Sequence, residues 1–291
     1  MSSEVQKFGG LHTKRKLDVL AKYLAAYVTV MKKREFELFY VDGFAGSGAS
    51  TAKSGNAEDT DPTLFDTDVL IEGSPIRALT VTPPFDRYVF VDSKAKNVAS
   101  LNRLADEFPD RRISVHQGDA NVVLTDICRE ISVKRMARAV VFLDPYGRSV
   151  NWQTIEALAA TKKVDLWYLV PVHAISRQVS EKGEFLPSAD MTDAMCGTDA
   201  WRKIAISKPD VSNDLFGVID DRLEKMARAN EYSEFFKERL ASIFQGGVAE
   251  RYIPLGRGRL HEFSLMFACA NPSTAAFETA LRIANHILRT T

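Results

Sequence analysis

The chain has 291 residues, of which 45% are hydrophobic and 26% charged. This composition is typical of a globular protein and excludes a fibrous or wholly disordered chain. Lys plus Arg and Asp plus Glu both number 38, so the formal net charge is zero, which excludes a global basic field but allows a local basic patch.

The three cysteines, Cys128, Cys196 and Cys269, are far apart and have no C-x-x-C spacing. Neither a disulfide framework nor a metal site is therefore predicted, and isolated reduced thiols are typical of the cytoplasm. Residues 1–10 are polar, and no run of about 20 apolar residues occurs. We accordingly expect no signal peptide and no membrane contact.

The N-terminal region, residues 1–35, is predicted to hold one amphipathic helix over residues 14–33, where apolar side chains recur at helical spacing. Its other face is basic. The basic residues are Lys14, Arg15, Lys16, Lys22, Lys32 and Lys33.

Residues 36–173 alternate between apolar runs and amphipathic segments. The predicted strands are residues 36–41, 87–92, 113–119, 139–144 and 164–171, and helices over 94–107, 120–131 and 152–161 separate the last four. Such alternation is typical of a parallel sheet covered on both faces. Within this region the acidic, Gly- and Ser-rich residues 49–71 are predicted to be a long loop or lid, followed by a helix with Ser74 as N-cap and Pro75 in its first turn.

Residues 174–247 break the rhythm and are predicted to form a helical insertion without strands, with helices over residues 199–207, 211–229 and 232–244. Residues 248–291 are then predicted to complete the core with strands over 248–255 and 262–269 and a helix over 274–288. The expected fold is α/β, a Rossmann-like, doubly wound and mostly parallel sheet with a C-terminal β-hairpin.

The first predicted strand runs into the turn Asp42-Gly43-Phe44-Ala45-Gly46-Ser47-Gly48. Glycines permit positive φ angles and close approach of the backbone to a ligand, so the turn predicts a nucleotide-binding loop. A phosphate-binding P-loop is disfavoured, because no Gly-Lys-Ser/Thr follows. A tight structural turn is the alternative.

Two further acids follow strands. Asp92 ends the second predicted strand, where an acid can accept hydrogen bonds from ribose hydroxyls. Asp119 follows the third and is predicted to meet the adenine amine. Both residues also suit the N-cap of the next helix. The fourth strand ends in Asp144-Pro145-Tyr146-Gly147, so we expect its acid to face the same pocket.

The sheet and motifs resemble those of class I S-adenosylmethionine-dependent methyltransferases. The first turn is similar to the Asp-x-Phe-Ala-Gly-x-Gly form of nucleic-acid methyltransferases. Asp144-Pro145-Tyr146-Gly147 resembles the catalytic motif of amino-group methyltransferases, although the usual second proline is missing; the nearer variant is Asp-Pro-Phe-Gly of enzymes that methylate a guanine amine in transfer RNA.

Taken in order, the motifs resemble most closely the three-Cys-motif partner protein family (TcmP), which is named for a partner with a three-cysteine motif. The resemblance rests on the basic N-terminal helix with Tyr23-Leu24, the glycine turn, Gly73-Ser74-Pro75, the Asp144 motif and Asn271-Pro272. It implies S-adenosylmethionine as cofactor and a three-cysteine-motif protein as partner.

On these resemblances, the cofactor would contact Asp42, Gly43, Phe44, Ala45, Gly46, Gly48, Asp92 and Asp119. Asp144 and Pro145 would orient an exocyclic amine of an RNA or DNA base, and Tyr146 would stack on that base.

Two other classes of function stay open. A non-catalytic binding protein would keep the fold and hold a partner through its insertion, with Leu215, Phe216, Phe235 and Phe236 partly exposed. A nuclease or other metal enzyme has little support, because no His/Asp spacing completes a ligand set around the strand-end acids.

Overall fold

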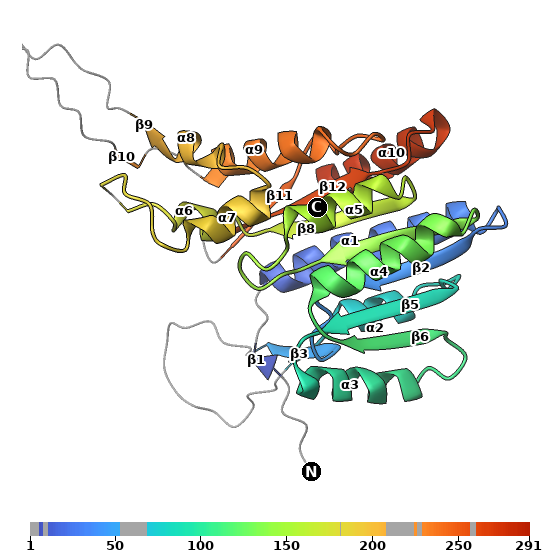
Figure 1. The fold of residues 1–291 in the computed structure, drawn as a ribbon. Coiled ribbons are helices and arrows are strands. Elements are labelled where there is room, and N and C mark those ends of the chain that lie inside the picture. Colours follow the sequence, from blue (N-terminus) through green and yellow to red (C-terminus); the bar gives the residue numbers. More distant parts are fainter. Residues whose placement is uncertain are drawn as a thin grey trace, which may run out of the picture.

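The computed structural model describes residues 6–7, 11–52, 69–180, 182–207, 224–225, 229–256 and 260–291. Its centre is a seven-stranded sheet in the order β11-β12-β8-β7-β2-β5-β6 (Figure 1). The strands are β2 (Glu37–Asp42), β5 (Arg87–Asp92), β6 (Ile113–Gln117), β7 (Ala137–Leu143), β8 (Val164–Val170), β11 (Ile253–Leu255) and β12 (Phe263–Cys269).

Five neighbouring strands, from β8 through β7, β2 and β5 to β6, are parallel. Strand β12 is antiparallel to β8, and β11 is antiparallel to β12. The sheet therefore ends in the antiparallel hairpin that the sequence predicted, in which β12 runs against the five parallel strands. The predicted fold, Rossmann-like and methyltransferase-like with a C-terminal hairpin, is confirmed.

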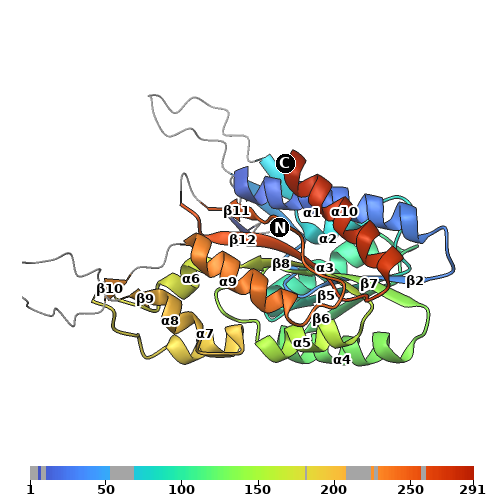
Figure 2. The same ribbon diagram turned by 90° about the horizontal axis from the view of Figure 1, so that it is seen from above.

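Helices cover both faces of the sheet (Figure 2). One face packs against α1 (Leu11–Met31), α2 (Ser74–Leu79), α3 (Ala95–Asp106) and α10 (Thr274–Thr290). The other packs against α4 (Ala120–Val133), α5 (Trp152–Ala160), α6 (Val172–Ser176), α7 (Ala189–Cys196), α8 (Trp201–Ala205) and α9 (Ala229–Ala241). No helix in the described residues is long and apolar enough to cross a bilayer.

Strand β2 has buried side chains on both faces, as a central strand should. Leu38 and Tyr40 join the core under α1 and α10, whereas Phe39 and Val41 join the core under α4 and α5. This alternation explains why the strand is an almost continuous apolar run in the sequence.

The region 174–247 contains α7, α8, α9 and the end of α6. Contrary to the prediction, it also contains strands. A short antiparallel pair is formed by β9 (Ile206–Ser207) and β10 (Glu224–Lys225), so the helix expected over residues 199–207 ends early. The helix expected over 211–229, with Leu215 and Phe216, lies almost wholly outside the described residues. Phe235 is 9% exposed and Phe236 is fully buried, so the partner-surface exposure expected of them in the binding-protein alternative is wrong.

The segment predicted as a loop over residues 49–71 begins and ends in strands. A small sheet joins β1 (Gln6–Lys7), β3 (Ala49–Ala52) and β4 (Val69–Glu72), with β3 and β4 antiparallel. The overlooked signal is the run Val69-Leu70-Ile71, which has high strand propensity. Residues 53–68, the centre of the expected lid, lie outside the described residues.

The start of α2 also differs from the prediction. Gly73 is the N-cap, and Ser74 and Pro75 are the first two helical residues. The Ser74 side chain hydrogen-bonds to Asp42 instead of capping the helix.

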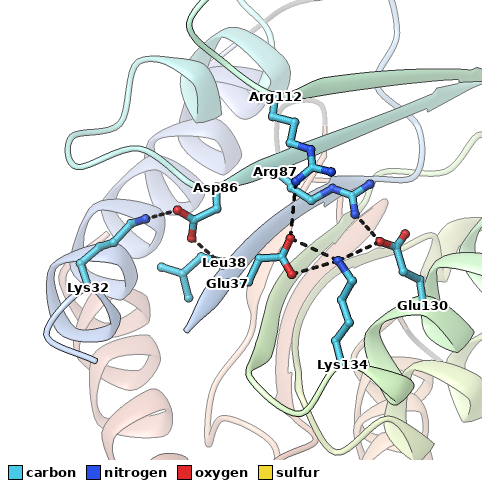
Figure 3. A network of polar contacts seen from close by, with 8 residues as sticks. All are labelled: Lys32, Glu37, Leu38, Asp86, Arg87, Arg112, Glu130 and Lys134. Carbon is cyan, nitrogen blue, oxygen red and sulfur yellow. Dashed lines mark hydrogen bonds and ion pairs between the residues drawn. The ribbon is translucent and has the colours of Figure 1, made fainter. Parts of the chain in front are cut away.

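Charged residues link the strands at the amino edge of the sheet (Figure 3). Lys134 Nζ lies 2.9 Å from Glu37 Oε2 and 3.2 Å from Glu130 Oε1, and Arg87 pairs with Glu130. These contacts join the start of β2 and β5 to the end of α4, far from the carboxyl ends of the strands.

We expect Glu37→Gln to lower the free energy of unfolding by about 0.5–1 kcal/mol, because Glu37 is partly exposed and faces Lys134 and Arg112. Urea denaturation measures the change. Glu107→Gln, at an exposed position just after α3, is the control and should be neutral. Equal stability of the wild type and Glu37→Gln would contradict the assigned role.

Candidate functional site at the carboxyl ends of β2 and β7

The chain runs from β2 outward through β5 to β6 and then returns to β7 on the other side of β2. Ligands in open α/β sheets bind at the carboxyl ends of strands where the order reverses in this way. Asp42 ends β2 and Asp144 directly follows β7, so the topology brings these two predicted site residues to the same edge of the sheet, at this reversal of strand order.

Asp144 forms an ion pair with Lys16 of α1, 128 positions earlier in the chain. The side chains of Lys16 and Asp144 are 14% and 27% exposed. The contact is made through Oδ2 of Asp144, so a second amine could approach Oδ1. Lys16 thus places a protonated amine on the predicted catalytic carboxylate.

Asp42 is fully buried and does not reach the protein surface. Its carboxylate accepts hydrogen bonds from Phe44 N (3.1 Å), Tyr40 Oη (3.2 Å) and Ser74. Burial raises its pKa to about 7, the nearby charge of Asp144 adds to the shift, and these hydrogen bonds oppose it. Asp42 therefore holds the glycine loop and the start of α2 together.

The glycines of the loop serve different purposes. A Cβ on Gly43 would lie 2.7 Å from Leu143 Cδ2, so this glycine allows β2 and β7 to pack closely. Gly46 has φ +63°, and a Cβ there would meet no atom within 4 Å. Gly46 therefore leaves open space at the carboxyl edge that a ligand can approach.

The rest of the loop is fixed by the neighbouring strands. Ala45 N donates to Val91 O (2.9 Å), and Gly48 O accepts from Gly73 N (2.8 Å). Ala45 is 5% exposed and Phe44 is half-buried. The predicted motif is thus one rigid turn in which Gly46 is the open position.

Asp92, at the end of β5, is bonded to the glycine loop and to the residue that precedes α3. Its Oδ2 accepts from Gly46 N (3.0 Å) and its Oδ1 from Lys94 N (2.8 Å). A carboxylate has about four acceptor sites, so these two bonds within the described part of the chain leave room for hydroxyl groups of a ligand. Lys94, and not Asp92, is the N-cap residue of α3.

Asp119 is the N-cap of α4, the alternative role that its position suggested. Its Oδ1 accepts from Asn121 N (2.8 Å) and Asn121 Nδ2 (2.9 Å). The residue is exposed at the same edge of the sheet, and both of these bonds are made by Oδ1. The cap does not conflict with a contact to an adenine amine, which stays a prediction.

Tyr146 is 60% exposed and follows the buried Pro145. Lys94 Nζ lies 5.1 Å from the centre of its ring, which is within range of a cation–π contact. Burial, together with the charges of Asp144 and Asp92, raises the pKa of its hydroxyl. Tyr146 therefore lies near both strand-end acids with its ring at the surface.

These residues fit a nucleoside cofactor. The open position at Gly46 admits a ligand against the backbone, and Asp92 beside it has unused acceptor sites for ribose. The described residues contain no group of three or more His, Cys, Asp or Glu that could hold a metal ion.

Sequence reasoning missed three residues that shape the site: Lys16, Ser74 and Lys94. Lys16 was one of six cations on a helix face, and nothing local distinguishes it, because its partner is 128 positions away. Ser74 followed a glycine and preceded a proline, which is the usual signal of an N-cap rather than of a tertiary contact.

Comparison with known proteins shows a similarity in fold and in nothing else. No protein-family model and no curated protein matches it. The solved structure of LPL1258 from Legionella pneumophila, described by the family model DUF519, has a TM-score of 0.53 and 13% identity over 96% of this chain and 93% of that one. The two chains share a fold.

A second solved structure is Trm1 from Pyrococcus horikoshii in complex with S-adenosyl-L-methionine. It has a TM-score of 0.46 and 10% identity, covering 99% of this chain but only 60% of Trm1. This lower score adds nothing to the likeness with LPL1258. The likeness to LPL1258 thus agrees with the sheet topology about the fold and assigns no activity.

Proposed function

We propose that this protein is an S-adenosylmethionine-dependent methyltransferase acting on an exocyclic amine of a nucleic-acid base. One observation carries the proposal. At the strand ends where the order of the sheet reverses, an open glycine loop lies at the same edge as the carboxylate of Asp144, and this carboxylate already binds the amine of Lys16. This edge of the sheet thus carries both a loop of the kind that binds cofactors and an acid that binds an amine.

The cofactor, held by the loop at Gly46 and by Asp92, would supply an electrophilic methyl group for the amine nitrogen, and its sulfur would keep the electrons of the carbon–sulfur bond. Oδ1 of Asp144 would accept a hydrogen bond from the amine and draw electron density to its nitrogen. Lys16 on Oδ2 would keep the carboxylate in place. The proton lost from nitrogen passes to Asp144 or to water. The protein's main contribution is alignment of the reacting atoms.

The target base would stack on Tyr146. Its ring is 60% exposed, and Lys94 lies over one face, which leaves the other for a base. A base within a duplex must first be flipped out, so single-stranded or structured RNA is the easier substrate.

The start of α1 is the proposed entry for the phosphate backbone. Lys14 and Arg15 are exposed next to Lys16, at the same edge as Asp144. We expect the double variant Lys14→Glu/Arg15→Glu to weaken RNA binding and to reduce its salt dependence, as measured by fluorescence anisotropy at several salt concentrations.

Lys33→Glu is the control for that pair. It is exposed beyond the other end of α1, roughly 28 Å away at about 1.5 Å per helical residue. It should bind RNA like the wild type. Equal weakening by both variants would mean that overall charge, and not this entry, determines binding.

We further propose kinship with the three-Cys-motif partner family, a cytoplasmic location and a three-cysteine-motif partner. The order of motifs along the chain supports the kinship. The three cysteines are all buried and unpaired, which is in keeping with a reducing compartment.

The test of the function is transfer of a labelled methyl group from S-adenosylmethionine into cellular RNA and DNA. Label in a base amine is expected. Label only in protein or small molecules would overturn the proposed substrate class, and no label in any fraction would overturn the activity.

A non-catalytic binding protein is the second candidate, because the Lys16–Asp144 ion pair is equally compatible with a purely structural role for Asp144. In that case the protein should co-purify with a three-cysteine-motif protein and show no affinity for S-adenosylmethionine. Tight cofactor binding would exclude this candidate.

A further inference from the structure

A cavity of about 360 Å³ lies at the opposite edge of the sheet, between α1 and α10. Its size is within the usual range for small-molecule sites. It is bounded by the amino ends of β7 and β8 and by the end of β12. The proposed methyltransferase site uses none of its residues.

The inner end of the cavity holds a buried acid. Asp165 is 8% exposed and lines the cavity. Its Oδ2 accepts from Tyr23 Oη (2.7 Å), and the Cys269 thiol also donates to it. A carboxylate has about four acceptor sites, so Asp165 can accept a further hydrogen bond from a molecule in the cavity.

Burial raises the pKa of Asp165 to about 6, although Tyr23, Cys269 and the charge of Arg138 oppose the shift. The carboxylate is thus less well solvated than in water. A ligand hydroxyl or amino group would replace part of the lost hydration.

The outer part of the cavity is cationic. Arg138 Nη1 donates to Ala137 O (2.7 Å) and Arg135 O (3.3 Å). Within the described part of the chain, these bonds leave Nη2 and Nε for a ligand. Arg34 adds a second guanidinium at the exposed rim.

Lys163, the third cation of the cavity, does not contribute a donor. Its ammonium donates to the carbonyls of Ile131, Ser132 and Lys134 at 2.8–3.0 Å, which uses all three of its hydrogens. Arg138 and Arg34 are therefore the cations that can meet a ligand.

The rest of the lining is mostly apolar, although Asn271, Ser273 and Thr279 also contribute to it. Tyr27 and Met31 come from α1, and Ala276 and Ile283 come from α10. The cavity therefore combines a buried acceptor, Asp165, with apolar side chains and two more exposed guanidinium groups.

We propose that this cavity binds a small amphipathic acid: a ring or short chain whose outer end carries a carboxylate for Arg138 and whose inner end carries a hydroxyl or amino group for Asp165. 4-Hydroxybenzoate carries both groups, the carboxylate and the hydroxyl, at opposite ends of one ring. Benzoate lacks the inner donor, and phenol lacks the outer charge.

Calorimetric titration of the full chain with these three probes tests the proposal. We expect 4-hydroxybenzoate to bind at least about tenfold more tightly than benzoate or phenol, as loss of one favourable polar contact implies. No binding of 4-hydroxybenzoate at millimolar concentration, or equal binding of the three probes, would overturn the proposal. These results need no variant and do not depend on methyltransferase activity.

Variants then assign the two ends. Asp165→Asn should bind 4-hydroxybenzoate more weakly than the wild type and discriminate less between it and benzoate, and Arg138→Gln should reduce the preference for 4-hydroxybenzoate over phenol. Arg135→Gln is the matched control, because this exposed residue lies outside the cavity, and it should bind like the wild type. Wild-type selectivity in both cavity variants would contradict the assignment.

Discussion

Replacing Asp144 with asparagine is expected to slow methyl transfer roughly 100- to 10,000-fold, the usual range for loss of a positioned acid–base group. Asparagine keeps the shape of the side chain but loses the charge that draws electron density to the amine. Binding of S-adenosylmethionine should change little, because Asp144 faces the acceptor amine in the proposed site. Single-turnover transfer from labelled cofactor measures the rate.

The ion pair with Lys16 requires a control, because Asp144→Asn also removes the partner of a mostly buried cation. In the double variant Lys16→Gln/Asp144→Asn, no unpaired charge is left, so stability lost in the single variant should be regained in part. The activity should stay low. If the double variant regained activity together with stability, Asp144 would have only a structural role.

Replacing Asp42 with asparagine is expected to stabilise the protein increasingly as the pH rises. The pKa of Asp42 is raised from 3.8 to about 7 in the folded state, so the folded protein holds a proton that the unfolded chain releases. The stability of the wild type should therefore fall as the pH rises from about 4 to about 7.

Asparagine cannot ionise, and its amide can still bond to Phe44 N and to the hydroxyls of Tyr40 and Ser74. The stability difference between Asp42→Asn and the wild type should grow by roughly 2–3 kcal/mol from pH 5 to pH 8, at ~1.4 kcal/mol per unit. Urea denaturation at both pH values measures it. Asp106→Asn, at the exposed end of α3, is the control; a constant difference for Asp42→Asn would contradict the raised pKa.

The fold could be predicted well because its signals are local. The central strands are apolar runs, three of which (β2, β5 and β7) end in or are followed directly by an acid, and the order of strands and helices limits the topology to few choices. The errors arose where the local signal was short or ambiguous. The run Val69-Leu70-Ile71 was too short to mark β4, and the two-residue strands β9 and β10 have no periodicity to detect.

The site was predicted in position but not in detail. Asp42 and Asp144 lie at the carboxyl ends of β2 and β7, where the strand order reverses, and this position follows from the order of the elements along the chain. Their surroundings do not follow: Asp42 is buried under Ser74, and Asp144 is paired with Lys16. These partners come from α2 and α1, and only the packing of those helices on the sheet brings them to the acids.

Binding of S-adenosylmethionine, NAD and ATP, compared by calorimetry on the wild type, Gly46→Ala and Gly46→Arg, tests the central claim most directly. Both variants carry the same backbone strain at φ +63°, but only arginine fills the open space beside Asp92. We predict that the wild type binds S-adenosylmethionine most tightly, that Gly46→Ala retains most of this affinity, and that Gly46→Arg loses it while staying folded. Tighter binding of NAD or ATP, or wild-type affinity in Gly46→Arg, would contradict a methyltransferase cofactor site at the carboxyl ends of β2 and β5.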